Sequence, residues 1–477
     1  MTVIAMKSPA KKIILFSLLL PLFCYLDAAA RQPMPADSLP ARWEYLPAAD
    51  GRTISIDDTW WKNFDDQLLD TLVSRGLAAN YDLQNAVNNI SIALNTYRSA
   101  RSDYFPQFTA SAAWQKERTS SKTGTGPAAT RSYWTAQAAI SWQVDLFGKI
   151  TEQAKAKKNL WQASQAEWTA TMLSVTSQII TQYITLREAQ MQLDLTQRHA
   201  RSQLEVVDMV IARNEAGVAS MLDVAQAKTV YYSTIAQIPV YENTVAASIN
   251  AIAVLLGTYP DKLPPAIYDT NDTLPQYRHI IPAGIPVDLL RRRPDIIETE
   301  KTVAAYAAQL GVAKKDFLPT LTLDGTISTM ATDITDLFSK GTLAYTIAPT
   351  LSWSFATGGE QIYNRRIAAE TLQSGINSYN LAVLTAVEET NNALTDYFNA
   401  LKHVRMVDDV VMWARKSLSL SVDLYKNGLT PFSNVVDAQE TLLQYETQAV
   451  TVRADALTAL VQIYTALGGG WDASNIQ

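Results

Sequence analysis

The densest run of charged side chains lies at residues 289–296, with the sequence Leu-Leu-Arg-Arg-Arg-Pro-Asp-Ile. Three adjacent arginines could bind an anion, because guanidinium groups match the geometry of carboxylates and phosphates. The same residues also have a structural interpretation. Pro294 and Asp295 suit the first turn of a helix, where an acidic group lies near the positive end of the helix dipole. We favour this second interpretation, in which the arginines pair with neighbouring carboxylates.

Other residue types that support catalysis or metal binding are sparse. His199, His279 and His403 lie far apart, and none is close to a plausible cluster of metal ligands. The sequence has no glycine-rich phosphate loop, no Cys/His pair and no Gly-x-Ser-x-Gly turn. We therefore predict no metal, no cofactor and no enzymatic activity.

The charge balance indicates no polyanionic partner. The formal net charge is −6, and no run of five like charges occurs. Neither nucleic acid nor an acidic membrane surface is therefore predicted as a partner.

The N-terminus has the pattern of a secretion signal. Lys7, Lys11 and Lys12 precede an apolar core at residues 13–23, and Ala28-Ala29-Ala30 offers small residues for cleavage. The core is too short to span a membrane comfortably. We expect export, removal of residues 1–30 and a mature chain that begins at Arg31.

Cys24 is the only cysteine in the chain. It is either an ordinary residue of the signal core or the lipid-bearing first residue of a lipoprotein. Lipoprotein signals usually place a small residue directly before the cysteine, whereas Phe23 stands there. We expect no lipidation, and cleavage after Ala30 would leave a mature chain without a thiol.

The sequence contains two similar halves about 211 residues apart. The segment Asp-Tyr-Phe-Pro-Gln-Phe-Thr at 103–109 returns as Asp-Phe-Leu-Pro-Thr-Leu-Thr at 316–322. Each half then contains a stretch of 68 residues, 149–216 and 360–427, in which Gly375 is the only glycine or proline. A continuous helix of that length would extend about 100 Å. The duplication predicts one elongated body built from two like units.

After each long helix the chain is expected to reverse direction and form a second, returning helix. Gly217 and Gly428 directly follow the long stretches, and helical patterns return at 221–256 and 432–467. A further helical pattern runs from Asp66 to Ala100. The apolar stripes are narrow, which suits helices packed side by side around a water-filled lumen. We expect Asn80, Asn85 and Asn88 to face that water.

Four segments change to a period of two residues, which predicts β-strands. Apolar side chains of one parity alternate with polar ones, and aromatic residues cap the apolar parity: Phe108, Ala110, Ala112 and Trp114; Trp134 to Val144; Leu321, Leu323 and Ile327; Leu343 to Phe355. A half-buried sheet of a soluble protein would show the same alternation. The lengths of about 10 to 14 residues favour tilted membrane-spanning strands. We then expect Trp134, Trp142, Tyr345 and Trp353 to face lipid near the interfaces.

Two hairpins cannot span a membrane alone, because their open edges would leave backbone groups unsatisfied in hydrocarbon. The chain must therefore combine its strands with those of other copies. The unpaired strand edges therefore predict self-assembly in a lipid bilayer, with the number of copies left open.

These residues resemble a known family, the outer-membrane factors or TolC-like channels, in particular the OprM/NodT-type branch that serves resistance-nodulation-division efflux pumps. The matching elements cover nearly the whole mature chain: Trp60-Trp61 with Phe64-Asp65-Asp66; Asn80, Asp82-Leu83 and Ala86; Phe105-Pro106; Trp142 with Asp145-Leu146-Phe147-Gly148; 284–290 with 292–296; and Tyr464 with 467–471. The Gly-Ile-Pro to Arg-Arg-Pro-Asp-Ile segment, 284–296, is the most specific of them.

The resemblance implies a mixed α and β fold. A homotrimer would combine two repeats and four strands per chain into a membrane β-barrel, continuous with a long antiparallel α-helical barrel in the periplasm. Its implied partners are a periplasmic adaptor protein and an inner-membrane resistance-nodulation-division pump. The implied function is a passive outer-membrane duct for drugs or other small molecules.

The resemblance also places a periplasmic gate near the turn after the second long helix. It implies roles for Tyr425, Lys426, Ser433 and Asp437, and Asp437 resembles the carboxylate of the family's acidic constriction ring. Lys426 stands where an arginine often tethers the closed state, and Ser433 replaces an apolar residue. Ser433 and Asp437 are four residues apart and share a helix face. The first-copy counterparts, 215–223 and Gln226, are expected beside them. The alternative for Asp437 is an ordinary surface carboxylate.

The predicted organisation follows the repeats. We expect a signal peptide (1–30), an extended arm (31–65), repeat 1 (66–260, hairpin at about 105–146), a linker (261–284), repeat 2 (285–471, hairpin at about 318–356) and a tail (472–477). Two alternatives to the efflux duct remain: a duct for type I protein secretion, and a periplasmic coiled-coil scaffold without a pore. The Arg-Arg-Pro-Asp segment favours the efflux branch, and the alternating aromatic strands disfavour the scaffold.

Overall fold

The computed structural model describes residues 59–120, 122, 127–269, 273–277, 292–355 and 357–469. The expected signal peptide, Cys24, most of the N-terminal arm and the C-terminal tail lie outside the described residues. So do Arg291, His279 and residues 270–272 and 278–284 of the expected linker.

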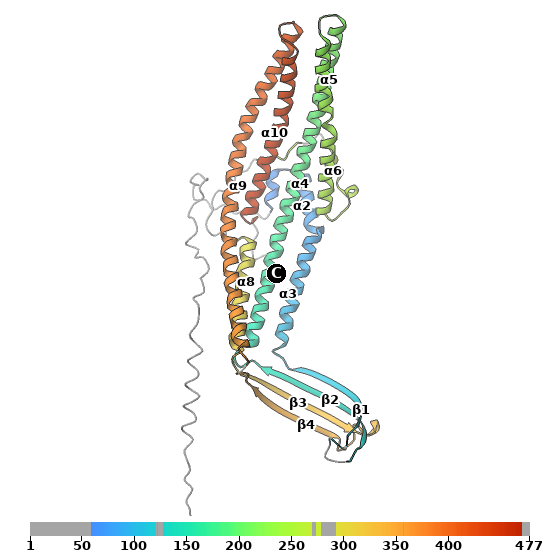
Figure 1. Ribbon diagram of the computed structural model, residues 1–477, viewed down its shortest axis with the longest axis vertical. Helices are drawn as coiled ribbons and strands as arrows, with labels where there is room; N and C mark the ends of the chain where they lie inside the picture. The colour runs from blue at the N-terminus through green and yellow to red at the C-terminus, as the bar shows by residue number, and fades with distance from the viewer. Residues whose placement is uncertain are drawn as a thin grey trace, which may run out of the picture.

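Two very long helices form the body of the molecule (Figure 1). Helix α4 (Lys149–Glu215) and helix α9 (Glu360–Lys426) each contain 67 residues. Gly148 and Gly359 precede them with φ of 73° and 94°, in the left-handed region that glycine adopts without strain. The structure thus confirms the two long helices predicted from the near absence of glycine and proline.

The returning segments differ between the two halves. Helix α10 (Ser433–Ala466) is continuous, whereas its counterpart is divided into α5 (Met221–Ile235) and α6 (Ile238–Leu255). Pro239 lies in the first turn of α6. Proline has no amide hydrogen, and its ring collides with the carbonyl four residues earlier, so the helix breaks just before it.

The helical segment from Asp66 to Ala100 is also divided, contrary to the expected continuous pattern. Helix α2 (Gln67–Ala79) ends at Asn80, and α3 (Tyr81–Ser102) begins there. The Asn80 side chain accepts from the amides of Asp82 and Leu83 and donates to the Leu255 carbonyl. The prediction that Asn80 faces water was wrong: it is 3% exposed, because it caps α3 and holds α6. Helix α8 (Pro294–Lys315) is the second-half counterpart of α3.

All four predicted strands are present and form one antiparallel sheet in the order β1-β2-β3-β4. They are β1 (Gln107–Arg118), β2 (Thr130–Val144), β3 (Thr320–Ala331) and β4 (Leu343–Ser352). Short 3₁₀ helices occur at η4 (Trp60–Phe64), η5 (Pro260–Lys262), η6 (Pro265–Tyr268) and η7 (Ile334–Asp336). The sheet lies at one end of the helical body (Figure 1), and β1 and β4 are its edges.

The strand register places the predicted apolar parity of all four strands on one face. Rows crossing the sheet on that face include Phe108–Ile140–Gly325–Ile347 and Ala110–Ala138–Ile327–Tyr345. Rows on the opposite face include Thr109–Ala139–Thr326–Thr346 and Gln107–Ser141–Asp324–Ala348. Ser141 donates to Asp324 on this second face, at 2.7 Å. The sheet therefore has one largely apolar and one largely polar face.

The main apolar core lies where the short N-terminal elements meet the ends of the returning helices. Trp60 stacks on Tyr464 with ring centroids 4.5 Å apart, and Phe64 packs beside Trp60. Leu69 and Ile179 are fully buried in the same cluster. The contact between Trp60 and Tyr464 thus joins the N-terminal and C-terminal parts of the chain in the middle of the molecule.

Polar contacts also join α4 to α10 along their length. Three pairs connect the helices: Ser177 with Thr465 at 2.6 Å, Gln192 with Thr451 at 2.9 Å, and His199 with Glu446 at 2.5 Å. Arg415 of α9 also donates to Glu446. Burial would raise the pKa of Glu446, but the hydrogen bonds from His199 and Arg415 outweigh it and hold that pKa below its usual range. Helices α9 and α10 also share an apolar cluster of Val407, Val411, Ala449 and Val452, so polar and apolar contacts together hold the three helices.

One segment, Met221–Leu255, is long and apolar enough to cross a membrane by length and composition alone. Its two helices pack along α4 and are interrupted before Pro239. Most of its apolar surface is exposed in the single chain, including Leu222, Tyr232 and Val254.

Candidate functional site

At the end of the helical body farthest from the sheet, two similar turns connect α4 to α5 and α9 to α10 (Figure 1). We call this end the tip. Gly217 and Gly428 have φ of 74° and 72°. The next residues close each helix end: the amide of Val218 donates to the Arg213 carbonyl, and that of Leu429 donates to the Leu424 carbonyl, both at 2.9 Å. These bonds satisfy carbonyls that the helix end would otherwise leave unpaired. The duplicated glycines therefore fix two tight turns at the tip.

Tyr425 is the central residue of this tip. It is 5% exposed, and its ring lies 5.0 Å from that of Phe432. The ring belongs to an apolar cluster that joins the ends of α4, α5, α9 and α10: Val207, Val210, Val224, Ala227, Tyr425, Phe432 and Val435. Tyr425 therefore anchors the end of α9 to the other three helices.

Polar contacts join Tyr425 to both helices of the first half. Its hydroxyl donates to Asp223 at 3.3 Å, and the Arg213 guanidinium lies 5.1 Å from its ring centroid. Arg213 also donates to the Lys426 carbonyl at 3.0 Å. Burial and the neighbouring Asp223 charge raise the pKa of Tyr425, so the phenol stays protonated and able to donate.

Asp223 is held in place for this contact. The Asp223 amide donates to the Ser220 hydroxyl and the Ser220 amide donates to the Asp223 carboxylate, which together form a capping box at the start of α5. The Ser220 hydroxyl also donates to Asp223 at 2.8 Å. Asp223 lies within the first-half segment that the sequence analysis expected beside the gate residues.

The other candidate gate residues lie nearby but are not joined to this cluster. Ser433 is half-buried at the start of α10, and Asp437 is exposed one turn further along. The Lys426 side chain is exposed and makes no ion pair with any residue that the structure describes. Within one chain, Arg213 and Tyr425 link the two halves, whereas the Lys426 side chain does not.

Arg213 was missed by the sequence analysis. A basic residue in the last turn of a helix is explained by the helix dipole alone and attracts no notice. A comparison of the two halves would have revealed it, because Arg213 and Asn214 correspond to Leu424 and Tyr425 at the offset of 211. The contact between Arg213 and Tyr425 exists because the two halves differ at both of these positions.

The aromatic residues expected to face lipid lie near both ends of the strands. Trp134 and Tyr345 lie toward the ends far from the helices, and Trp142 and Trp353 toward the helices. The two helix-proximal indoles each donate to a backbone carbonyl before the Pro of the repeated motif: Trp142 to Tyr104 at 2.9 Å and Trp353 to Phe317 at 3.0 Å. These equivalent bonds fasten each strand to the end of the preceding helix.

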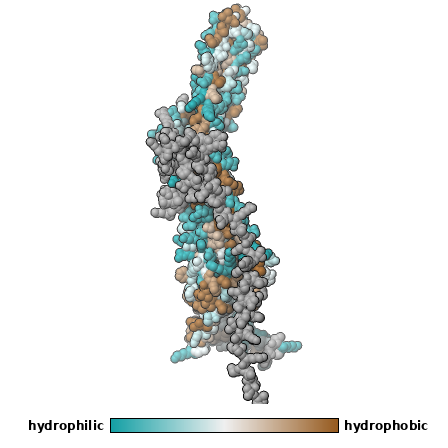
Figure 2. All heavy atoms as spheres, turned by 90° about the vertical axis from the view of Figure 1, so that its left-hand side faces the viewer, coloured by the Kyte–Doolittle hydropathy of each residue, from teal (hydrophilic) through white to brown (hydrophobic). Residues whose placement is uncertain are grey.

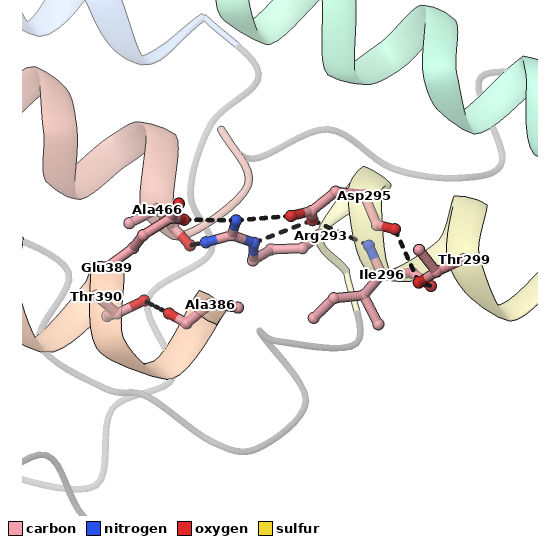
Figure 3. A network of polar contacts seen from close by, with 8 residues as sticks. All are labelled: Arg293, Asp295, Ile296, Thr299, Ala386, Glu389, Thr390 and Ala466. Atoms are coloured by element: carbon pink, nitrogen blue, oxygen red, sulfur yellow. Dashed lines mark hydrogen bonds and ion pairs between the residues drawn. The ribbon is translucent and has the colours of Figure 1, made fainter. Parts of the chain in front are cut away.

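The candidate anion site at Arg293 has the structural role that we favoured. Its guanidinium donates twice to Asp295, once to Glu389 and once to the Ala466 carbonyl (Figure 3). Pro294 and Asp295 open helix α8 as expected, while Arg292 is exposed. Arg293 thus joins the start of α8 to α9 and the end of α10, and its charge is neutralised by carboxylates.

Replacing Arg293 with alanine should destabilise the middle of the molecule. Breaking a buried ion pair costs about 3–5 kcal/mol, and we expect about 2–3 kcal/mol here because Asp295 and Glu389 stay half-exposed to solvent. Thermal unfolding in detergent, followed by circular dichroism, should show a lower midpoint. Arg453→Ala is the matched control, because its pairing with Asp408 is solvent-exposed and worth at most about 1 kcal/mol. Equal midpoints for both variants would contradict this role.

Within the described part of the chain, no group of His, Cys, Asp and Glu side chains is arranged to hold a metal ion.

Known proteins are similar in sequence to this chain over most of its length. A family model described as "Outer membrane efflux protein" matches residues 72–258 and 285–469. The chain is 27% identical over 446 residues to the probable efflux pump outer membrane protein TtgC of Pseudomonas putida, covering 92% of this chain and 91% of that protein. It is 28% identical over 429 residues to nodulation protein T of Rhizobium leguminosarum, covering 87% and 85%.

Two solved structures are similar over nearly their whole length. The outer-membrane channel OprN has a TM-score of 0.84 at 27% identity, covering 93% of this chain and 98% of that one. The Campylobacter jejuni CmeC outer membrane channel has a TM-score of 0.85 at 22% identity, covering 93% and 95%, and supports the fold alone.

Proposed function

Because this chain belongs to the outer membrane efflux protein family, we propose that it works as a homotrimeric, passive duct of a resistance-nodulation-division efflux system. The chain is an outer-membrane channel of a tripartite efflux system, with its helical tube in the periplasm. Its partners are a periplasmic adaptor and an inner-membrane pump. Related proteins are named as antibiotic, solvent and toluene efflux components. For this chain we propose only that the transported substrates are drugs or other small molecules.

The apolar face and unpaired edges of the sheet are the main support for this proposal. One face is apolar, and both edge strands lack a partner among the described residues of the chain. Unpaired strand edges cannot remain open in hydrocarbon, where no water replaces the missing hydrogen bonds. Closure with further copies satisfies both edges, and three copies would give a barrel of twelve strands.

The helices also have exposed apolar surfaces that neighbouring copies could cover. Large apolar side chains are exposed along one side of α9, including Met406, Trp413 and Leu424, and along α5 and α6. Figure 2 views the α9 side and shows apolar patches between hydrophilic ones along the tube. Exposed apolar area of this extent favours association with neighbouring copies.

The aromatic positions support a membrane barrel of ordinary height. Trp134 and Trp142 are eight residues apart, as are Tyr345 and Trp353. Eight residues span about 26 Å along a strand, or about 20 Å of height at a tilt of about 40°, close to the ~25 Å apolar band of such barrels. We propose that the two pairs form interfacial girdles.

We further propose that Tyr425, Lys426, Ser433 and Asp437 belong to the periplasmic gate. The contacts of Tyr425 with Asp223 and Arg213 support a closed tip in which the second half is held by the first. Asp437 is exposed and free to approach its copies on the axis of an assembled tube.

Mass measurement of the purified protein in mild detergent tests the assembly. We expect the main species to contain three processed chains, and we expect the protein to aggregate when detergent is removed. A stable monomer or dimer would contradict the trimer. A protein that stays soluble without detergent would instead favour the periplasmic scaffold.

A further inference from the structure

Basic side chains gather where the helices meet the sheet. The last three turns of α3 and α8 and the first three turns of α4 and α9 lie together at that level (Figure 1). These windows, 92–103, 149–160, 305–316 and 360–371, contain ten Lys and Arg against five Asp and Glu. The whole chain has the opposite balance, 40 against 46. The fold therefore concentrates positive charge at one height.

Two of these cations form ion pairs, and two others, Arg101 and Arg366, each lie 5.8 Å from a tyrosine ring centroid, those of Tyr97 and Tyr363. Lys149 pairs with Asp316 at 2.6 Å, and Lys315 pairs with Glu152 at 3.3 Å and donates to the Gly148 carbonyl. The other eight form no ion pair with any described residue, and most are exposed. We call these eight residues the basic collar: Arg98, Arg101, Lys155, Lys157, Lys158, Lys314, Arg365 and Arg366.

Helix dipoles do not account for the collar. A cation near the C-terminal end of α3 or α8 is favoured by the negative end of the dipole. The dipole acts only within the first and last turns of a helix. It therefore does not explain Lys155, Lys157 and Lys158 in the second and third turns of α4, nor the adjacent Arg365 and Arg366 in the second turn of α9. Mutual repulsion among exposed cations also disfavours such clustering, and an external anion bound there would offset it.

The residues between the collar and the strands provide a second observation. Exposed apolar side chains occupy the strand–helix junctions: Phe105, Leu146, Phe147, Leu318 and Phe355. Along the molecule, an apolar sheet face is thus followed by apolar junctions and then by cations. Lys158 lies about 14 Å of helix rise beyond Lys149. Headgroups occupy about 5–8 Å on each side of the hydrocarbon, and charge acts over a further ~8 Å at physiological salt.

We propose that the basic collar binds anionic phospholipid headgroups of the inner leaflet and thereby fixes the depth of the barrel in the outer membrane. The proposal rests on the outer-membrane location given above. The recognised group is the phosphate of a lipid already held in a bilayer, and the attraction adds over several cations rather than forming one pocket. The junction side chains enter the acyl boundary, while the collar lies at the height of the phosphates.

The test measures binding of fluorescent phosphatidylglycerol to the assembled channel in mixed detergent micelles. The variant Lys155→Gln/Lys157→Gln/Lys158→Gln should weaken this binding at least tenfold and leave phosphatidylcholine binding unchanged. The control Lys228→Gln/Lys402→Gln/Lys416→Gln removes three exposed charges closer to the tip and should bind like wild type. The conservative Lys→Arg triple variant should retain binding, and Arg365→Gln/Arg366→Gln should weaken it if the α4 variant fails to assemble.

Three outcomes would overturn the proposal. Equal loss of binding in the tip control would mean that only overall charge matters. Displacement of the lipid by inorganic phosphate at an equal concentration would indicate a free-anion site. A change of ion selectivity in the collar variant, with unchanged lipid binding, would place these cations in the lumen. In each of these cases, an intact oligomer that still forms a conducting channel would leave the proposed efflux function supported.

Discussion

Replacing Ile347 with arginine is expected to prevent assembly of the membrane barrel. Ile347 is 79% exposed on the apolar face of the sheet, in the row Phe108–Ile140–Gly325–Ile347. An arginine facing lipid at the bilayer midplane costs about 2–4 kcal/mol. A trimer would carry this cost three times, about 6–12 kcal/mol in total, which is comparable to the whole stability of a typical domain.

The neighbouring residue provides the control. Thr346 is also exposed, but it lies on the polar face in the row with Thr109 and Thr326. Arginine there would face the lumen, so Thr346→Arg should assemble normally and change only conductance. Ile140→Arg lies in the same row as Ile347 and should behave like Ile347→Arg.

The measurement is the fraction of each variant recovered from outer membranes as an intact oligomer in detergent. We expect a large loss for Ile347→Arg and none for Thr346→Arg. Normal assembly of Ile347→Arg together with failure of Thr346→Arg would show that the two faces have been assigned in reverse.

The sequence predicted those features that depend on local patterns repeated in both halves. Long stretches with only one glycine, Gly375, and no proline predicted α4 and α9, because few other residues interrupt a helix. Period-two alternation predicted the strands and the parity of their apolar faces. The offset of 211 residues placed equivalent turns at Gly217 and Gly428, where the structure has them.

Features that depend on one residue or on distant pairs were harder to predict. Asn80 interrupts a helical pattern because its side chain bonds better as a cap, and Pro239 breaks only one of the two returning segments. The contact between Arg213 and Tyr425 joins residues 212 positions apart. The net charge of −6 and the absence of charge runs predicted no acidic membrane surface as a partner, in contrast to the proposal for the basic collar. The collar was not predicted, because no local run of charges reveals that four helix ends meet at one level.

The tip of the tube is expected to open when Tyr425 is truncated. Tyr425→Ala removes a ring from the apolar cluster and breaks the contacts with Asp223 and Arg213. Loss of a large buried aromatic side chain costs about 3–5 kcal/mol, and a trimer would pay this cost at three sites. Leak conductance of single channels in a planar bilayer should therefore rise well above that of wild type.

Smaller changes separate the contributions to this closure. Tyr425→Phe keeps the ring and removes only the hydrogen bond to Asp223, so its leak should lie between wild type and Tyr425→Ala. Arg213→Ala removes the contacts to the ring and to the Lys426 carbonyl, and should also raise the leak. Lys426→Ala should raise the leak less, unless its side chain tethers a neighbouring copy. An exposed control, Asp423→Asn, should not change it.

Asp437 should control which ions pass through the closed tip. If three Asp437 side chains converge on the axis, their repulsion must be relieved by cations, protonation or nearby basic groups. They would raise the local cation concentration and make the resting pore cation-selective. Asp437→Ala should then shift the reversal potential in a salt gradient toward zero, whereas Asp437→Glu should keep it. An unchanged reversal potential in Asp437→Ala would make this residue an ordinary surface carboxylate, leaving Tyr425 and Arg213 as the residues that close the tube.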